Sequence, residues 1–205
     1  MTELLDLPVR RVGPVPFRVA RSNAAVDAIC EAGRSLTPGT AVHFANAYSI
    51  ALADSNNSYA QILANHSSAV FTDGVPVAWV GRRAYPEVAP HWERVYGPDV
   101  MEAVFEREEQ LTHYLLGGSP ETLEALQRTI TERWPHVRIV GAESPPFRAL
   151  GDDEVVPQDE RIRAAGANLV WVGLGTPKQD WEAARLANSI PSVVLAVGAA
   201  FDFLA

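Results

Sequence analysis

The sequence predicts a single-domain, Rossmann-like α/β fold, in which a mainly parallel sheet has helices on both faces. Short apolar runs alternate with longer amphipathic runs along the chain, a pattern typical of βα units and a parallel sheet. The length of 205 residues suits one domain over residues 1–205, and the apolar fraction of 47% is ordinary for a globular protein. Several apolar runs end in Asn, Asp-Gly or Gly-Gly, and ligands of open α/β sheets bind at such strand ends.

Each predicted element follows from its own residue pattern. The apolar runs predicted to form strands are 41–45, 69–72, 113–116, 137–140, 168–172 and 192–197. The amphipathic stretches predicted to form helices are 49–54, 58–65, 120–133 and 178–187. The helix at 120–133 has the clearest start, because Ser119 can cap it and Pro120 suits the first helical position.

The stretch 144–157 interrupts this alternation, because it is rich in proline and acidic residues. Proline and acidic residues together are typical of exposed connections. We therefore expect a surface loop that ends where a helix begins at Gln158. Asp152 and Asp153 lie in this stretch, so we expect both carboxylates to be solvated.

Charge and composition exclude several functions. A formal net charge of −8 argues against a nucleic-acid partner, because such proteins usually carry a basic face, although Arg82 and Arg83 could form a local basic patch. Cys30 is the only cysteine, which excludes an internal disulfide and a cysteine metal cluster, and its apolar helical surroundings predict a core position.

No signal peptide and no stretch of ~20 apolar residues is present. We therefore expect a cytoplasmic protein.

Asp73 is the first candidate for chemistry, because it directly follows the apolar strand 69–72. Gly74 permits a sharp turn that presents the carboxylate at the sheet edge. A carboxylate there could accept a proton from a substrate hydroxyl, best if partial burial raises its pKa above the ordinary ~3.9. The alternative is an Asp-Gly turn in which the side chain bonds to its own backbone.

The segment 173–181, Gly-Leu-Gly-Thr-Pro-Lys-Gln-Asp-Trp, resembles a phosphate-binding loop in outline. It places Gly175 and Thr176 between a strand and a helix N-terminus, although it is not a Walker A sequence and a lone Gly-x-Gly is weak evidence. Lys178 is the only lysine among the 17 lysines and arginines. A compact ammonium beside free backbone N–H groups suits a diphosphate. The alternative is a solvated lysine in the first turn of a helix.

Arg94 and Asn46 are further candidates for binding. Arg94, in the segment 92–99, could hold a phosphate through its bidentate guanidinium, or could form a structural ion pair with a neighbouring acid. Asn46 directly follows the strand 41–45 and could bond a sugar or uracil, or could cap a helix. The sequence leaves both alternatives open.

Metal-dependent and serine-hydrolase chemistry lack their usual motifs. No Asp-x-Asp occurs, so the common carboxylate pair for a metal-bound nucleotide sugar is missing. The five histidines are scattered without a metal-ligand spacing, and no Gly-x-Ser-x-Gly is present. We therefore expect metal-independent chemistry without a cofactor. His113, inside an apolar strand, is expected to be a packed residue.

Read together, the motifs are far more specific than any one alone. In order they are 44–49 (FANAYS), 72–74 (TDG), 93–99 (ERVYGPD), 115–118 (LLGG), 173–181 (GLGTPKQDW) and 197–203 (VGAAFDF). From about Val12 to Ala205 this set resembles the WecG/TagA/CpsF family of glycosyltransferases. The Pro-Lys-Gln element and the closing Gly-Ala-Ala-Phe-Asp are its most specific parts.

The resemblance implies an inverting transfer of a sugar from a UDP donor to a polyprenyl-diphosphate-linked acceptor sugar (GlcNAc). Such lipids feed enterobacterial common antigen, wall teichoic acid and exopolysaccharide. N-acetylmannosamine or its uronate is the best-known donor sugar of the family, and glucose or another uronic acid is an alternative.

By position, the resemblance makes Asp73 the base, with Asn46, Arg94 and Gln179 as active-site companions. Charge on departing UDP would then fall to Arg94, Lys178 and helix N-termini. A non-catalytic UDP-sugar-binding protein is the alternative from another class. The joint presence of Asp73, Arg94 and Gln179 argues against it.

Two departures from the family pattern bear on function. Many relatives have Thr where Phe44 stands, so a hydroxyl contact is absent and the donor could differ. Relatives also continue into a basic, aromatic C-terminal appendage that meets the membrane and helps to complete the site, whereas this sequence stops at Ala205. We therefore expect a shortened form, or one that relies on a partner, which binds donor but turns over poorly.

We expect the full-length form at the inner face of the plasma membrane. The apolar end 201–205 could promote homo-oligomers.

Overall fold

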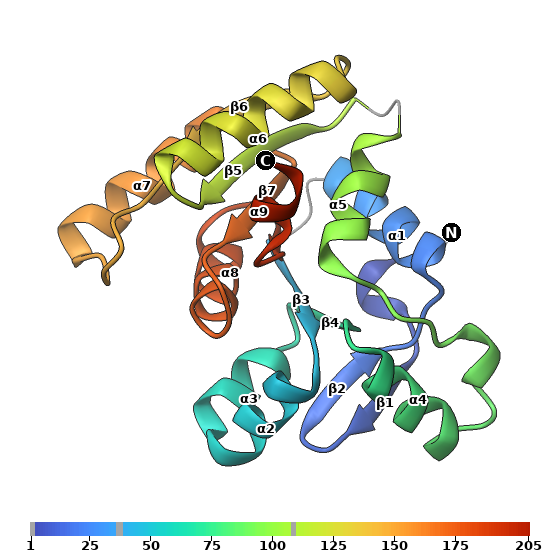
Figure 1. Ribbon diagram of the computed structural model, residues 1–205. Coiled ribbons are helices and arrows are strands. Elements are labelled where there is room, and N and C mark those ends of the chain that lie inside the picture. Colours follow the sequence, from blue (N-terminus) through green and yellow to red (C-terminus); the bar gives the residue numbers. More distant parts are fainter. Residues whose placement is uncertain (1–2, 36–38, 108–109) are drawn as a thin grey trace.

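A six-stranded parallel sheet forms the centre of the computed structural model, which describes residues 3–35, 39–107 and 110–205 (Figure 1). The strand order is β4-β3-β8-β7-β5-β6. The strands are β3 (Thr40–Ala45), β4 (Ser68–Thr72), β5 (Thr112–Gly117), β6 (Arg138–Glu143), β7 (Leu169–Gly173) and β8 (Val193–Ala196). Each apolar run predicted to be a strand forms one of them, so the expected α/β fold is confirmed.

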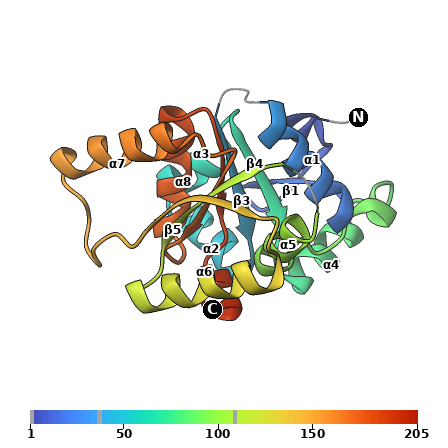
Figure 2. The ribbon, with the colours of Figure 1, turned by 90° about the horizontal axis from the view of Figure 1, so that it is seen from above.

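Helices cover both faces of this sheet, as expected. They are α1 (Ser22–Ser35), α2 (Ala47–Ser55), α3 (Asn57–Leu63), α4 (Val75–Ala84), α5 (Gly97–Phe105), α6 (Pro120–Arg133), α7 (Asp152–Ala165), α8 (Lys178–Ser189) and α9 (Ala200–Leu204). One core contains α5, α6 and α9 through Met101, Leu126 and Phe201, whereas a second contains α7 and α8 through Ile162 and Leu186. Figure 2 shows α6 and α9 on one side of the strands, with α7 and α8 on the other.

The central strand β7 shows why the sheet needs both layers. Leu169 and Trp171 belong to the core with α5 and α6, whereas Val170 and Val172 belong to the core with α7 and α8. All four side chains are fully buried. Because successive side chains of a strand point to opposite faces, a run that is apolar at every position requires cover on each side.

The predicted helices are present with small shifts at their ends. The stretches 49–54, 58–65, 120–133 and 178–187 form α2, α3, α6 and α8. Cys30 is fully buried in α1, as its apolar surroundings predicted. Within the described ranges, no helix has the length and apolar character needed to cross a membrane.

The stretch 144–157 is not a loop throughout, so this prediction was wrong. The helix α7 begins at Asp152 rather than at Gln158, and Asp153 also lies in its first turn. Acidic residues in a first turn are favoured by the partial positive charge of the helix N-terminus. The acid-rich composition that suggested a loop therefore fits a helix start equally well.

A cap before α7 holds this early start. The backbone N–H of Gly151 donates to the Glu154 carboxylate at 3.0 Å, and Arg148 donates to the same carboxylate at 2.6 and 2.7 Å. Pro157 lies inside the helix, where it removes one backbone hydrogen bond. The capping bonds stabilise the start of α7, which the proline-rich composition had led us to predict as a loop.

A short antiparallel hairpin outside the main sheet was not predicted. It consists of β1 (Val9–Val12) and β2 (Val15–Arg18), which flank a turn at Gly13 with φ of 58°. Phe17 of β2 packs in an apolar cluster with Trp92 and with residues of α3 and α4. The strands have four residues each and include arginine and proline. Their alternation of apolar and polar residues is therefore too short to predict strands from the sequence.

Candidate active site

A cavity of about 350 Å³ lies where β3, β4, β7 and β8 end. The predicted site residues that line it are Asn46, Asp73, Gly175, Thr176 and Gln179. Each comes from a segment that follows one of these strands, since parallel strands bring their carboxyl ends to one edge. The cavity is completed by Phe44, Tyr96, Gly97, Pro98, Ala196, Val197, Gly198, Ala199 and Phe203.

Asp73 is held at the end of β4 with one carboxylate oxygen free. Its backbone N–H donates to the carbonyl oxygen of Ala45 at 3.0 Å, which continues the pairing with β3. Its Oδ1 atom is buried and has no hydrogen-bond partner among the described residues. Burial raises the pKa of Asp73, and this rise is opposed by the charge of Arg94 and by the Asn46 side chain and Gly97 backbone. A carboxylate with a raised pKa and a free oxygen is suited to accept a proton.

Arg94 lies beside Asp73 but is not among the residues that line the cavity. Its Nε donates to the Asp73 carbonyl oxygen at 2.7 Å, and its guanidinium lies over the Tyr96 ring, 4.0 Å from the centroid. In the described part of the chain, no carboxylate lies within salt-bridge distance of this guanidinium. The hydrogen bond to a backbone oxygen replaces the structural ion pair considered from the sequence. The side chain is exposed and retains N–H donors for an anion.

Asn46 combines the two roles that the sequence left open. Its Oδ1 accepts from the backbone N–H groups of Tyr48 at 2.9 Å and Ser49 at 3.3 Å, so it caps α2. The same side chain lines the cavity and stabilises the Asp73 carboxylate. Because the cap occupies the oxygen, the amide N–H₂ is the end available to Asp73 or to a ligand.

Gln179 presents a free acceptor to the cavity. Its side-chain nitrogen donates to the Ala196 carbonyl oxygen at 3.2 Å and to Thr176 Oγ1 at 3.4 Å. A carbonyl can only accept, so the Ala196 contact fixes which end of the amide is nitrogen. The residue is 4% exposed, and its Oε1 has no partner among the described residues.

Gly198 allows this arrangement of Gln179. Its φ of 57° lies in the left-handed region, and a Cβ there would stand 3.1 Å from Gln179 Oε1. A side chain at this position would therefore be strained and would crowd the free oxygen. The glycine after β8 keeps this acceptor open to a ligand.

Lys178 faces a different cavity from its neighbour Gln179. It lines a space of about 500 Å³ at the ends of β5, β6 and β7, with Nζ 5.0 Å from the Phe147 ring centroid. The chain passes from β5 to α6 on one face of the sheet, and from β7 to α8 on the other face. Where the connections of two neighbouring strands diverge in this way, open α/β sheets have a crevice at the strand ends. The structure thus separates Lys178 from the Asp73 cavity, and α8 begins between the two.

A buried polar network behind Gln179 was not foreseen from the sequence. Asp180 accepts from the Tyr59 hydroxyl at 3.0 Å, and its other oxygen lies 2.9 Å from His43 Nδ1. Burial and the Asp180 charge raise the pKa of Tyr59, so the hydroxyl remains a donor. The network ties the first turn of α8 to β3 and α3. The sequence signal that could have indicated it is His43, a polar residue inside the apolar run 41–45.

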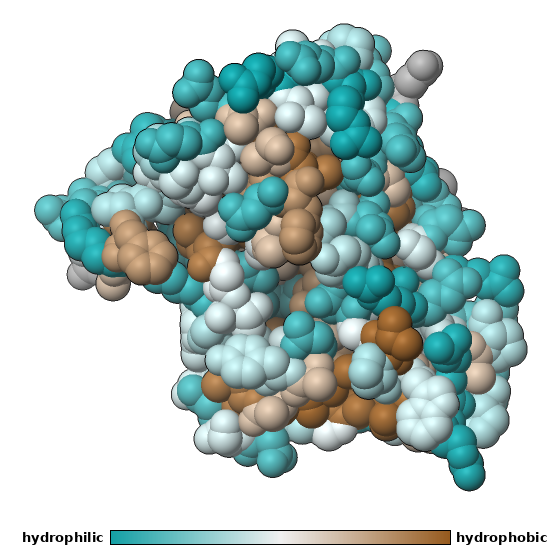
Figure 3. Space-filling model, viewed as in Figure 1, coloured by the Kyte–Doolittle hydropathy of each residue, from teal (hydrophilic) through white to brown (hydrophobic). Residues whose placement is uncertain are grey.

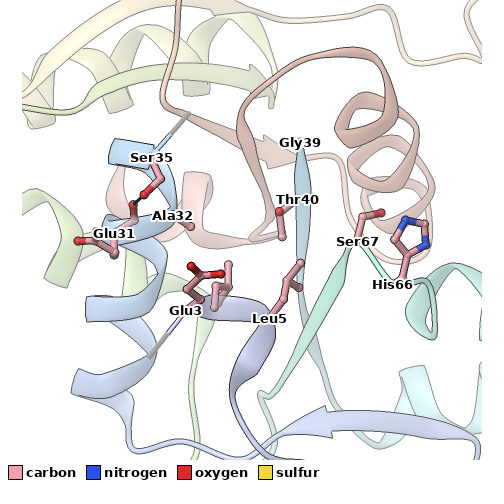
Figure 4. A pocket seen from close by; sticks show the side chains of 10 residues that line it. Glu3, Leu5, Glu31, Ala32, Ser35, Gly39, Thr40, His66 and Ser67 are labelled. Carbon is pink, nitrogen blue, oxygen red and sulfur yellow. Dashed lines mark hydrogen bonds between the residues drawn. The ribbon is translucent and has the colours of Figure 1, made fainter. Parts of the chain in front are cut away.

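A third cavity, of about 360 Å³, lies at the opposite, amino-terminal end of β3 and β4 (Figure 4). Figure 4 shows side chains from α1 and from the starts of both strands around it. Ser35 Oγ donates to the Glu31 carbonyl oxygen at 2.9 Å, and the Glu31 carboxylate binds Arg34 at 2.6 Å. Ser67 Oγ donates to Asn65 Oδ1 at 3.0 Å. Protein groups already satisfy these polar atoms.

The fold and the carboxyl-end cavity define an α/β protein with a candidate ligand site at the strand ends, built around the half-buried side chain of Asp73. The model of the glycosyl transferase WecG/TagA/CpsF family matches residues 10–205. The chain belongs to this family, as the order of its motifs predicted. It is therefore a glycosyltransferase, an enzyme with a sugar donor and an acceptor, and its family is linked to cell-surface polysaccharide synthesis.

Proposed function

We propose that the enzyme transfers a sugar, with inversion, from a UDP donor to a polyprenyl-diphosphate-linked GlcNAc. N-acetylmannosamine or its uronate is the donor sugar we favour. The observation that supports this most is the pair of buried, unpartnered acceptor atoms, Asp73 Oδ1 and Gln179 Oε1, on one cavity. Buried acceptors without partners destabilise a protein, so a ligand that donates hydrogen bonds explains them. Sugar hydroxyl and acetamido N–H groups are such donors.

Asp73 acts as the general base in this proposal. The acceptor hydroxyl oxygen attacks the anomeric carbon, and the bond from that carbon to the UDP oxygen breaks with its electron pair leaving on the diphosphate. The hydroxyl proton passes to Asp73 Oδ1. One in-line displacement of this kind inverts the anomeric centre and needs a base on the side opposite the leaving group.

The leaving diphosphate is stabilised without a metal in this proposal. Among the residues the structure describes, no cluster of three or more His, Cys, Asp or Glu could hold a metal ion. Arg94, bonded to the Asp73 carbonyl oxygen, and Lys178, which lines the adjoining cavity, each bring a positive charge to one of the two spaces. A diphosphate placed between them would also face the N-terminus of α8, whose free N–H groups favour anions.

The acceptor determines where the reaction takes place. A polyprenyl chain is too apolar to leave the bilayer, so the enzyme must work at the membrane surface, and a UDP donor places it on the cytoplasmic face. No membrane-spanning helix is needed for this peripheral association.

A transfer assay tests the proposal. The protein is incubated with a panel of UDP sugars and a short-chain polyprenyl-diphosphate-GlcNAc analogue, and products are read by mass spectrometry. We expect one donor to give product in the parent chain and a rate about 10²- to 10⁴-fold lower in Asp73→Asn, with UDP affinity unchanged by calorimetry. Transfer at the parent rate by Asp73→Asn would remove Asp73 as the base.

A matched control separates the base from a general effect of charge. Asp99 is an exposed carboxylate in the first turn of α5, and its charge acts on Asp73. Asp99→Asn makes the same chemical change outside the cavity, so we expect it to keep the parent turnover within a few-fold. UDP binding without transfer of any sugar by the parent would instead favour a non-catalytic binding protein.

A further inference from the structure

The helix α4 turns an apolar face to solvent. The buried side of the helix consists of Val77, Ala78 and Gly81. On the other side Val75 is 59% exposed, Trp79 is 65% exposed and Val80 is 42% exposed. Val75 and Trp79 are one helical turn apart, so they share a face. Figure 3, which has the view of Figure 1, shows brown side chains at the surface in the lower right part of the molecule, where α4 lies.

Two arginines continue this face toward the end of α4. Arg82 and Arg83 are exposed in the last turn, and in the described part of the chain neither lies within salt-bridge distance of a carboxylate. Arg82 Nε donates to the Ala78 carbonyl oxygen at 3.3 Å. In a protein with a net charge of −8, two such cations beside an exposed tryptophan reverse the local charge. This combination is complementary to a partner with an anionic surface and an apolar interior.

We propose that this surface docks on an anionic phospholipid bilayer. We name it the α4 face, and it consists of Val75, Pro76, Trp79, Val80, Arg82 and Arg83. A helix with tryptophan and valine on one side and arginine beyond them fits the boundary between acyl chains and headgroups. The arginines are attracted to anionic headgroups. One face of a ten-residue helix, about 15 Å long, is small against the ~800 Å² per partner of a stable protein interface.

The α4 face adjoins the active-site cavity, and this step rests on the proposed function. Only Gly74 separates Asp73 from the first residue of α4. A Cβ on Gly74 would lie 3.5 Å from the Asn46 Cβ, so the start of α2 is also adjacent. Tyr48, in the first turn of α2, is 59% exposed. Docking through α4 would hold the proposed base at the headgroup level, where the first sugar of a polyprenyl-linked acceptor stands.

Vesicle binding tests this assignment. The full chain is sedimented with vesicles of phosphatidylglycerol and phosphatidylcholine, and with vesicles of phosphatidylcholine alone. We expect binding to the anionic vesicles, accompanied by a blue shift of tryptophan fluorescence. Trp79→Ser should lower the partition coefficient roughly tenfold and abolish the shift. Arg82→Gln with Arg83→Gln should lower the coefficient about fivefold per arginine.

Two matched variants control for exposure and charge. Phe147→Ser removes an aromatic side chain that is 101% exposed but lies on the loop before α7. Arg128→Gln with Arg138→Gln makes the same change in net charge, because both arginines are exposed and, as far as the structure describes the chain, unpaired with carboxylates. Both variants should bind anionic vesicles like the parent.

Transfer to a soluble acceptor analogue separates this inference from the proposed function. The α4-face variants should keep that activity and lose only vesicle binding. Absence of vesicle binding by the parent, or parent-level binding by Trp79→Ser and the double arginine variant, would overturn the docking surface. A dimer that dissociates in Trp79→Ser, without vesicle binding, would assign the face to a second copy and overturn it as well. Vesicle binding that depends on α4 without any sugar transfer would leave the surface standing and refute the proposed reaction.

Discussion

The Asp73 cavity, at the carboxyl ends of β3, β4, β7 and β8, and the cavity at the amino ends of β3 and β4 have nearly equal volumes, about 350 Å³ and 360 Å³. Their polar groups differ. At the amino end, Ser35 and Ser67 donate to protein oxygens and Glu31 binds an arginine. In the Asp73 cavity, Asp73 Oδ1 and Gln179 Oε1 are buried and have no hydrogen-bond partner among the residues that the structure describes.

Whether the polar atoms of a cavity have hydrogen-bond partners therefore distinguishes a ligand site from an ordinary packing cavity better than the volume of the cavity does. Each unpartnered buried acceptor costs about 1–3 kcal/mol of stability, and a bound ligand that donates would recover it. Of the four such atoms among the described residues, those of Asp73 and Gln179 share the Asp73 cavity, whereas those of His43 and Gln158 do not. We therefore identify the candidate site by two unpartnered buried acceptors that line the same cavity.

The largest effect is expected from removal of the Asp73 carboxylate. Asp73→Asn should lower the transfer rate about 10²- to 10⁴-fold, the usual contribution of a general base. In the parent, the rate should fall as pH decreases through the raised pKa of Asp73, because the protonated carboxyl cannot accept a proton. Rates measured from about pH 4.5 to 8 should show this fall in the parent, and the residual rate of the variant should lack it. The same pH dependence in both proteins would show that another group is the base.

A smaller loss is expected from Gln179→Leu, which removes the second free acceptor. Loss of a hydrogen bond to substrate should lower kcat/KM about tenfold to a hundredfold. Gln158→Leu is the matched control, since Gln158 is also a buried glutamine with an unpartnered Oε1, but it lies outside the Asp73 cavity. Equal losses in the two variants would mean that an unpartnered oxygen alone does not identify a site.

A still smaller effect, of opposite sign, is expected on stability. Because burial raises the pKa of Asp73, the folded state binds this proton more tightly than the unfolded state. The contribution of Asp73 to the free energy of unfolding therefore decreases as pH rises through the raised pKa. Asp73→Asn lacks the buried charge, so at neutral pH it should be at least as stable as the parent. Urea unfolding across a pH series should show the difference shrinking near the ordinary Asp pKa of ~3.9, and a less stable variant at neutral pH would contradict the expectation.

The smallest effect is expected at the amino-end cavity. Glu31→Gln changes a carboxylate that lines this space, far from the strand ends that carry the site. It should leave kcat and KM within about twofold of the parent, because exposed ion pairs contribute little. A large loss of transfer in this variant would remove the distinction between the two cavities.

The sheet and five residues of the Asp73 cavity were predicted for one reason. Asn46, Asp73 and Gly175 each follow a predominantly apolar strand, and parallel strands end at a common edge. The residues could therefore be assigned to one place without coordinates. The hydrogen bonds that free Gln179 Oε1 could not be predicted, since they depend on a carbonyl of β8 and on the conformation of Gly198.

Other features escaped prediction because they depend on contacts between segments. Lys178 was placed correctly at the start of a helix, but sequence does not give the rotation of that helix, which turns the residue toward Phe147. The start of α7 depends on a bond from Arg148 to Glu154, which proline-rich composition obscured. Exposure of Trp79 could not be read either, because tryptophan is usually assigned to the core.

The rotation of α8 sets a limit on how this family member can vary. Consecutive helical residues differ by 100°, and Lys178 and Gln179 use this difference to face two cavities, while Asp180 is fixed to His43 and Tyr59. One residue inserted between β7 and α8 would move Lys178 to the position of Gln179 and set an ammonium beside the proposed base. The length of the connection between β7 and α8 should therefore be inherited more strictly than its composition.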